Sequence, residues 1–290
     1  MKTTINYPSG DSNIAAELYL PANLEKPLPL IVMCHGFCGV KELLLPGFAE
    51  QFQQAGFAVI TFDYRGFGAS GGEAGRLQPA LQIEDIKATI DFAVQMSIID
   101  ADKIALWGTS FGGANAIVAA VEDARVKCLA VQVTFGDGER VITGELNEAE
   151  AAKLRSSLEK MQVRKAEGGK EMWVPIAKVL NDEQSKAFYS RYAEEFPALK
   201  TKIPFLTTAE TLAHKPENYL SDLNAPLHIT VAEQDGVNPP AESYSLFDKA
   251  KEPKQLLSIA GATHYDIYEG EYLTQVSAAQ VAWFKQYLQV

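Results

Sequence analysis

The sequence predicts an α/β protein: a mostly parallel central sheet flanked by helices, with a helical cap inserted into it. Short apolar runs alternate with longer helical patterns, which is typical of βαβ units. The alternation stops between Asp137 and Asn224, where charged helical segments take over, and it resumes at Pro226. The chain has 290 residues, of which 47% are hydrophobic, so it is long enough to bury one large core.

The first third of the chain supplies the beginning of the sheet. Residues 4–20 alternate in hydropathy, which predicts an antiparallel strand or hairpin. Residues 28–33, LPLIVM, are too few for a helix and are apolar throughout, as expected of a strand buried on both faces. A helix is expected at 41–55 and a second buried strand at 57–64, so the three elements form a βαβ unit.

A glycine-rich loop follows, in which Gly66, Gly68 and Gly71 satisfy the pattern G-x-G-x-x-G. A dinucleotide site would need a helix directly after the glycines and an acidic residue at the end of a second strand. Here Pro79 postpones the helix, and the acidic residues that follow lie within it. We therefore interpret the loop as structural.

The rest of the sheet domain follows from the same patterns. An apolar stripe of Ile83, Ile86 and Ile90 at helical spacing predicts an amphipathic helix that covers the sheet. The further expected elements are a helix at 81–97, strands at 126–135, from 226 and at 255–259, and helices at 241–250 and 273–288.

The interruption predicts a helical cap at 137–224, inserted into a core domain made of residues 1–136 and 225–290. Helices placed between two strands are expected to cover the carboxyl edge of the sheet, where ligands bind in such folds. Three helices are expected, the first capped by Asn147 with Glu150, the second by Asn181 with Gln184, and a short third one at 209–214.

Composition limits the partners. A formal net charge of −11 argues against binding nucleic acid or anionic membranes. No basic and apolar leader follows Met1 and no apolar run approaches a membrane span, so a cytoplasmic location is expected. Cys34, Cys38 and Cys128 form neither a disulfide framework nor a metal ligand set, and no metal or organic cofactor is expected. A small-molecule substrate is expected, and a homodimer is compatible with the sequence.

The stretch IALWGTSFGGANA carries the central motif. It leads from an apolar strand into a small-residue helix and places Ser110 between Gly108 and Gly112, which matches G-x-S-x-G. On such a strand-to-helix turn the serine hydroxyl is lifted clear of the sheet. Ser110 is therefore the candidate nucleophile, and the amide of Phe111 is placed to hydrogen-bond a developing oxyanion.

A serine hydroxyl needs an adjacent base, usually an imidazole oriented by a carboxylate. His264 lies in a loop just past the last strand and is the candidate base. Of the other histidines, His35 suits an oxyanion loop, His228 a strand interior, and His214 either packing or substrate contact in the cap.

Two carboxylates preserve the chain order serine, acid, histidine. Asp235 lies in the turn EQDGVNPP after the penultimate strand, and Asp137 follows the strand after the Ser110 helix. The turn at Asp235 is better suited to hold a carboxylate in place, so Asp235 is preferred as the acid. Asp137 remains the alternative.

These motifs together resemble the α/β-hydrolase superfamily over nearly the whole chain: HGF after an early strand, FDYRGFGAS after the next and GTSFGG at the turn. The chain is similar to the bacterial serine hydrolases grouped with dienelactone hydrolases and Xaa-Pro dipeptidyl peptidase-like esterases. The resemblance implies Ser110 as nucleophile, Asp235 as acid and His264 as base. It implies oxyanion amides at Phe111 and Phe37, with Cys38 as the near alternative to Phe37.

The expected activity is hydrolysis of a carboxylic ester or related acyl bond of a small molecule through an acyl-enzyme. An acyltransferase, a peptidase or amidase, a C–C bond hydrolase and a non-catalytic receptor are the alternatives. Substrate contacts are expected from Cys38 and His214 and from the cap's aromatic residues. The alternative is that these aromatic side chains form the hydrophobic core of the cap itself. The aromatic residues are Trp173, Phe188, Tyr189, Tyr192 and Phe196.

Overall fold

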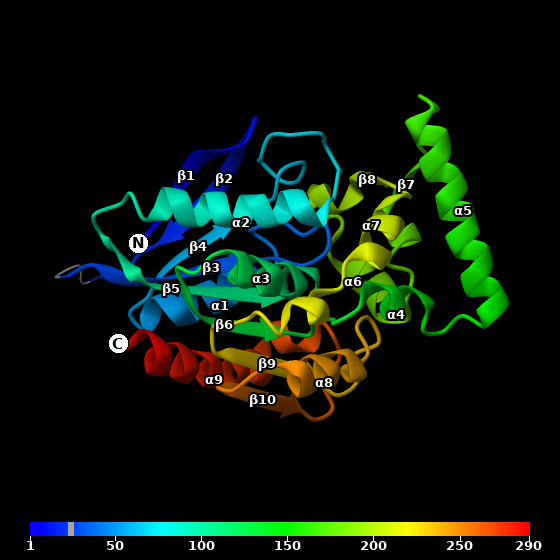
Figure 1. Cartoon of the computed structure of the whole chain (residues 1–290). Helices are drawn as coiled ribbons and strands as arrows, with labels where there is room; N and C mark the ends of the chain where they lie inside the picture. Colours follow the sequence, from blue (N-terminus) through cyan, green and yellow to red (C-terminus); the bar gives the residue numbers. More distant parts are fainter. Residues whose placement is uncertain (23–25) are drawn as a thin grey trace.

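The computed structural model describes residues 1–22 and 26–290. Its centre is an eight-stranded sheet in the order β1-β2-β4-β3-β5-β6-β9-β10 (Figure 1). From β4 to β10 in this order neighbouring strands are parallel, whereas β1 pairs antiparallel with β2, and β2 with β4. The strands are β1 Lys2–Ser9, β2 Ser12–Tyr19, β3 Leu28–Cys34, β4 Ala58–Phe62, β5 Ile99–Thr109, β6 Val126–Gln132, β9 Leu227–Ala232 and β10 Lys254–Ile259. The predicted mostly parallel sheet is confirmed.

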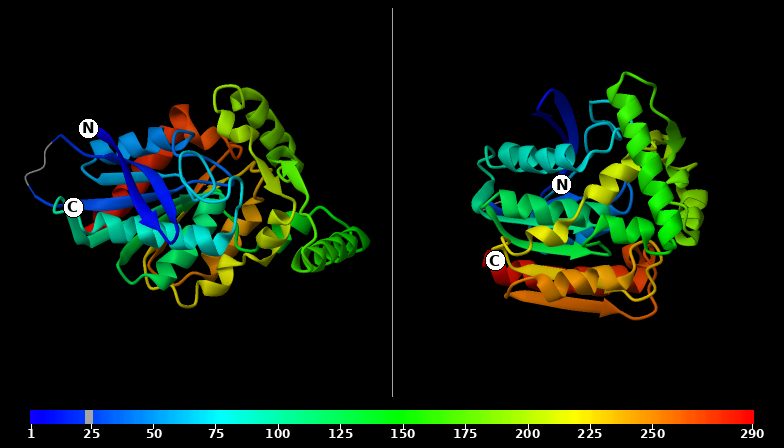
Figure 2. Two further views of the ribbon diagram at one scale, coloured as in Figure 1. Left: turned by 90° about the horizontal axis from the view of Figure 1, so that it is seen from above. Right: turned by 45° about the vertical axis from the view of Figure 1, so that its right-hand side comes forward.

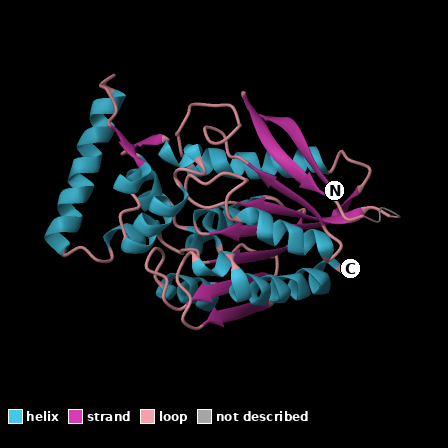
Figure 3. Cartoon of the chain, turned by 180° about the vertical axis from the view of Figure 1, so that it is seen from behind, coloured by secondary structure: helices cyan, strands magenta, loops and turns pink. Residues whose placement is uncertain are grey.

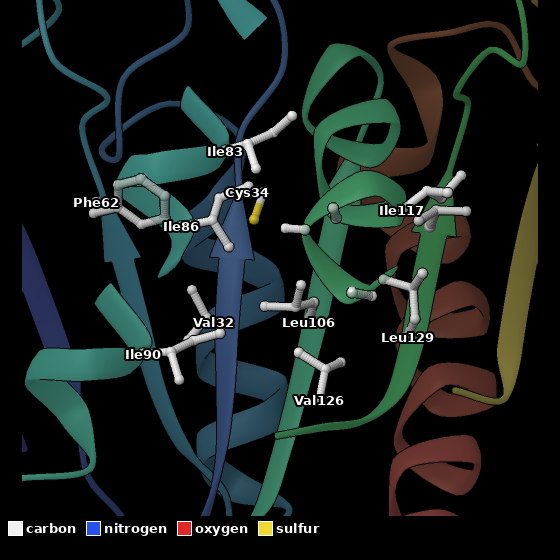
Figure 4. Close-up of a cluster of buried hydrophobic side chains, with 14 of the residues drawn as sticks. Val32, Cys34, Phe62, Ile83, Ile86, Ile90, Leu106, Ile117, Val126 and Leu129 are labelled. Atoms are coloured by element: carbon white, nitrogen blue, oxygen red, sulfur yellow. The ribbon is translucent and has the colours of Figure 1, made fainter. Parts of the chain in front are cut away.

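Helices cover both faces of this sheet because its central strands are apolar on both sides. Along β3, Val32 packs into the cluster on the α2 and α3 side, and Met33 into the cluster on the α1 and α9 side. Figure 4 shows the first cluster, where Ile86 and Ile90 of α2 face Val32. The covering helices are α1 Leu45–Gln54, α2 Pro79–Ala93, α3 Phe111–Glu122, α8 Pro240–Lys249 and α9 Gly270–Leu288.

Several helices begin elsewhere than the sequence suggests, among them α1, α2 and α9. Helix α2 begins at Pro79 itself, since proline fits the first helical turn, where its missing N–H is not needed. Helix α1 begins at Leu45 rather than at residue 41. Lys41 is held outside the helix because its backbone N–H and its ammonium both donate to the carboxylate of Asp63, at 2.7 and 2.8 Å.

Most of the segment at 137–224, called the insertion below, lies beyond the carboxyl ends of the parallel strands, away from both termini (Figures 1 and 2). Its last part runs back along the sheet domain, where Leu220 and Leu223 join the core. It is not wholly helical as expected, because β7 and β8 form a small antiparallel sheet, visible in Figure 3. Its elements are α4 Gly138–Thr143, α5 Glu148–Ala166, β7 Trp173–Pro175, α6 Glu183–Tyr192, β8 Lys202–Pro204 and α7 Thr207–Ala213, with short 3-10 turns at Ile176–Lys178, Pro197–Lys200 and Pro216–Tyr219.

The helix starts within the insertion agree only in part with the expected caps. The capping box of Asn147 and Glu150 begins α5 as predicted. Helix α6 is capped one residue later than predicted, by Asp182, whose side chain accepts from the Ser185 N–H. In residues 1–22 and 26–290, no helix combines the length and the apolar character that crossing a bilayer requires.

Candidate active site

The turn between β5 and α3 places Ser110 in a strained conformation. Its φ is 53° and its ψ is −125°, a region that residues other than glycine rarely adopt. A Cβ at Gly108 would lie 2.6 Å from the Gly112 carbonyl oxygen, and a Cβ at Gly112 would lie 2.2 Å from that of Cys34. The close backbone packing therefore accepts only glycine on both sides of the serine, which is the physical content of the G-x-S-x-G motif.

His264 and Asp235 form a buried pair in the loops that follow β10 and β9. The Nδ1 of His264 lies 2.8 Å from the Oδ2 of Asp235, and their side chains are 3% and 2% exposed. The other carboxylate oxygen accepts the backbone N–H groups of Val237 and Asn238, each at 2.8 Å. A carboxylate on Nδ1 makes that nitrogen the donor, which leaves Nε2 as a proton acceptor.

Asp137, the alternative carboxylate, has a different role. Its side chain caps α4 by accepting from the N–H groups of Glu139 and Arg140. It also lies 3.3 Å from the ammonium of Lys215. Asp235 is thus the carboxylate that is hydrogen-bonded to the candidate base, and Asp137 belongs to the start of the insertion.

Ser110 and His264 line the same cavity, of about 50 Å³. Among the described residues, the Ser110 hydroxyl is hydrogen-bonded to Asn238, whose Nδ2 lies 3.3 Å from Oγ, and not to His264. The same amide donates to the Val133 carbonyl at 2.7 Å. Sequence analysis missed Asn238, although its place three residues after Asp235 in the same turn was a usable signal.

The candidate oxyanion donors lie at the ends of β3 and β5. Phe37 lines the cavity, and Phe111 opens α3, where the first amides have no partner within the helix. Their rings meet edge to face at 5.6 Å. Cys38 is fully buried and does not line the cavity, and burial raises the pKa of its thiol well above the usual value.

The three other histidines are buried in packing positions. His35 lines the cavity, and its Nδ1 donates to the Gly36 carbonyl at 3.0 Å. His228 bonds Thr230 within β9. His214 stacks on Phe111 at 5.6 Å and lies outside the cavity lining. Burial lowers the pKa of all three imidazoles, to about 4 for His214 and His228.

The aromatic residues of the insertion lie in three places. Tyr189 and Phe188 line the cavity beside Ser110, and the Phe188 ring stacks on Tyr265 at 4.2 Å. Tyr192 lines a second cavity of about 260 Å³, which shares Phe188 and Tyr265 with the first. Trp173 lies elsewhere, because its ring packs under the guanidinium of Arg76 at 5.1 Å.

Gln184 of α6 joins both loops of the site. Its Nε2 donates to the Gln234 carbonyl at 2.7 Å, and its Oε1 accepts the N–H groups of Gly236 and His264, each at 3.1 Å. The sequence suggested Gln184 as a helix-capping partner. Because Asp182 and Ser185 make that cap instead, the glutamine side chain is left to reach across to the sheet.

The glycine-rich loop after β4 wraps around Asp63. A Cβ at Gly68 would lie 2.2 Å from the Asp63 carboxylate, which also accepts the Ala69 N–H at 2.9 Å. Gly66 has a φ of +82°, and a Cβ there would meet a backbone oxygen at 2.5 Å. The loop is filled by the protein's own carboxylate, in agreement with a structural role.

Relatives of the chain have been found among known proteins. An uncharacterized 31.7 kDa protein of the traX-finO intergenic region of Escherichia coli is 49% identical over 261 residues, which cover 90% of this chain and 91% of the relative. The quorum-quenching protein AidA of Acinetobacter baumannii is 30% identical, with 99% of this chain and 95% of AidA covered.

A solved structure shares the fold. The α/β hydrolase GrgF from Penicillium superposes with a TM-score of 0.84 at 22% identity, and each chain is covered completely. Residues 25–271 match the family model described as serine aminopeptidase, S33. The chain therefore belongs to the S33 serine aminopeptidase family of α/β hydrolases.

Proposed function

We propose that this protein is a serine hydrolase that cleaves small, neutral carboxylic esters through an acyl-enzyme. One observation carries the proposal: Ser110 on its strained turn and His264, bonded to Asp235 at 2.8 Å, line one cavity. A hydroxyl, an imidazole and a carboxylate in this chain order are the groups that acyl transfer requires.

In the proposed reaction His264 takes the hydroxyl proton at Nε2 while Ser110 Oγ bonds to the ester carbonyl carbon. The amides of Phe37 and Phe111 hold the negative oxygen, and each such donor typically contributes roughly 3–4 kcal/mol. The alcohol leaves with the proton from His264, and water then cleaves the acyl-enzyme to give the acid. Because Asn238 donates to Oγ, the hydroxyl proton stays free for His264.

The lining of the cavity favours a neutral substrate over a peptide N-terminus. An aminopeptidase needs a carboxylate to bind the substrate's ammonium group, since a buried unpaired charge is costly. None of the described lining residues is Asp, Glu, Lys or Arg. Most of them are apolar, among them Phe37, Leu43, Leu44, Leu45, Leu180, Phe188, Leu199 and Val237.

The size of the cavity favours a short acyl group. About 50 Å³ adjoins Ser110, and the stacked rings of Phe188 and Tyr265 line both this space and the second cavity of about 260 Å³, together with Leu44 and Tyr268. A longer chain would have to displace these rings. Phe188 is therefore proposed to limit the acyl chain length.

The test is a series of p-nitrophenyl esters of increasing acyl length. We expect kcat/KM to be highest for the short esters and Ser110→Ala to be inactive. Phe188→Ala should extend the range to longer chains, because removing the ring joins the two cavities. Tyr192→Ala is the matched control, since Tyr192 borders only the second cavity, and it should keep the preference for short esters.

Two results would contradict the proposal. Full ester hydrolysis by Ser110→Ala would remove Ser110 from the reaction. Cleavage of aminoacyl anilides with no turnover of esters would replace the proposed substrate class by N-terminal peptides.

A further inference from the structure

We infer that Gln184, a residue of the insertion, is a positioning residue for two loops of the site. It holds the acid loop, residues 233–239 with Asp235, in register with the base loop, residues 260–265 with His264. The insertion thereby takes part in aligning the Asp235–His264 pair, in addition to walling the cavity. The catalytic consequence rests on the proposed function, whereas the alignment itself is a property of the fold.

A single amide group makes all three connections. The bond from Nε2 to the Gln234 carbonyl is 2.7 Å long, and the two bonds accepted by Oε1 from Gly236 and His264 are each 3.1 Å. Gln234 and Gly236 flank Asp235 on either side. The third partner is the backbone of His264 itself, so one planar amide bonds the backbone on both sides of Asp235 and the backbone of His264.

The acid loop is shaped to let this amide approach. A Cβ at Gly236 would lie 3.1 Å from the Nε2 of Gln184, which is tighter than ordinary packing. One backbone hydrogen bond, from the Gln234 N–H to the Ala262 carbonyl at 2.8 Å, also joins the two loops on the side of the sheet. Without Gln184, the N–H groups of Gly236 and His264 lose the side-chain acceptor that they share.

The neighbouring residue provides a matched control. The Ser185 hydroxyl lies 3.0 Å from the hydroxyl of Tyr265, so it ties the same helix to the same base loop. It has no hydrogen bond to the Asp235 turn or to His264 among the described residues. Ser185→Ala thus weakens the docking of α6 and leaves both loops attached to Gln184.

The kinetic test compares these variants on a short p-nitrophenyl ester. We expect Gln184→Ala to lower kcat by roughly tenfold to a hundredfold at a nearly unchanged KM, because small misplacements of catalytic groups slow the chemical step. Ser185→Ala should stay close to the unmodified protein. Gln184→Glu keeps an oxygen acceptor for the two N–H groups and loses the donor, so its kcat should fall between the two.

The spectroscopic test does not depend on turnover. The proton shared by His264 Nδ1 and Asp235 gives a low-field NMR signal, assigned by its loss in Asp235→Asn. We expect this signal to shift or broaden in Gln184→Ala and to persist in Ser185→Ala. Thermal unfolding of each variant verifies the fold, and Gln184→Glu carries the test if the alanine variant does not fold.

An unchanged signal together with an unchanged kcat in the Gln184 variants would overturn the inference. Equal losses in the Gln184 and Ser185 variants would overturn it as well, since they would assign the effect to docking alone. If instead Ser110→Ala keeps its activity while the NMR signal responds to Gln184, the proposed function fails and the alignment role stands.

Discussion

The sheet edge and the insertion are built in different ways. In α3, next to Ser110, ten of twelve residues are buried, whereas in α5 of the insertion only Ala151 and Leu158 are buried out of nineteen. The turn at Ser110, between β5 and α3, is fixed by backbone packed against backbone at Gly108 and Gly112. The insertion reaches the site through a few side chains of α6, chiefly Gln184, Phe188 and Tyr189. The groups proposed for bond cleavage therefore lie on the more buried region, and those proposed for substrate selection lie on the less buried one.

The largest expected effect is a difference in kcat between variants of two carboxylates, Asp235 at the sheet edge and Asp137 at the start of the insertion. Asp235→Asn should lower kcat by roughly 10³–10⁴-fold, because the amide no longer fixes the tautomer of His264. Asp137→Asn should change kcat by no more than about twofold, since asparagine also caps helices and the ion pair with Lys215 is partly exposed. Steady-state kinetics of both variants checks this, and the reverse order would assign the acid to the insertion boundary.

Glycine substitutions test the difference in packing directly. A Cβ added at Gly112 would lie 2.2 and 2.3 Å from the carbonyl oxygens of Cys34 and His35, neither of which is a flexible side-chain end. Gly112→Ala should cost about 4 kcal/mol of unfolding free energy or prevent folding. In the insertion, Gly168 has a φ of +81° and open space around it, so Gly168→Ala should cost about 1 kcal/mol. Urea unfolding measures both, and equal costs would contradict the comparison.

The insertion contacts the sheet domain where His214 stacks on Phe111, and the stability of this contact should fall at acidic pH. Burial lowers its pKa from 6.5 to about 4, so the folded protein binds fewer protons than the unfolded chain between these values. The stability it contributes is present above pH 6.5 and is lost as the pH falls toward 4, by up to about 3 kcal/mol. His228 has a similarly lowered pKa and adds to the same loss.

The variant His214→Phe isolates the contribution of His214 to the pH dependence of stability. The phenyl ring keeps the stacking on Phe111 and cannot be protonated, so the variant should gain stability relative to the unmodified protein as the pH falls from 7 to 4. Unfolding free energies at several pH values provide the measurement. Curves that run parallel for the two proteins would show that His214 does not titrate in this window.

The same contrast explains what could be predicted from the sequence. The strands and the turn at Ser110 follow from local patterns, because apolar runs and glycine spacing fix the backbone directly. Asp235 and His264 follow from the rule that polar residues after parallel strands meet at one edge of the sheet. These local rules do not extend to the insertion, where the small sheet of β7 and β8 was not foreseen.

The role of Gln184 could not be predicted because it depends on contacts between distant parts of the chain. Helix α6 is capped by Asp182 instead of Asn181, so Gln184, expected as the capping partner, bonds the two loops of the site instead. A glutamine on a polar helix looks solvent-exposed until the two loops that it bonds are in place. Trp173 could not be placed for the same reason: its position is set by packing against Arg76, a distant residue, and not by the cavity.

The central claim is that the hydroxyl of Ser110 is activated as a nucleophile. Labelling with a fluorophosphonate, followed by peptide mass spectrometry, tests it without knowledge of the substrate. The account predicts one adduct, on Ser110, that is absent from Ser110→Ala and forms much more slowly in Asp235→Asn. An adduct on another residue, or undiminished labelling of Ser110→Ala, would contradict it.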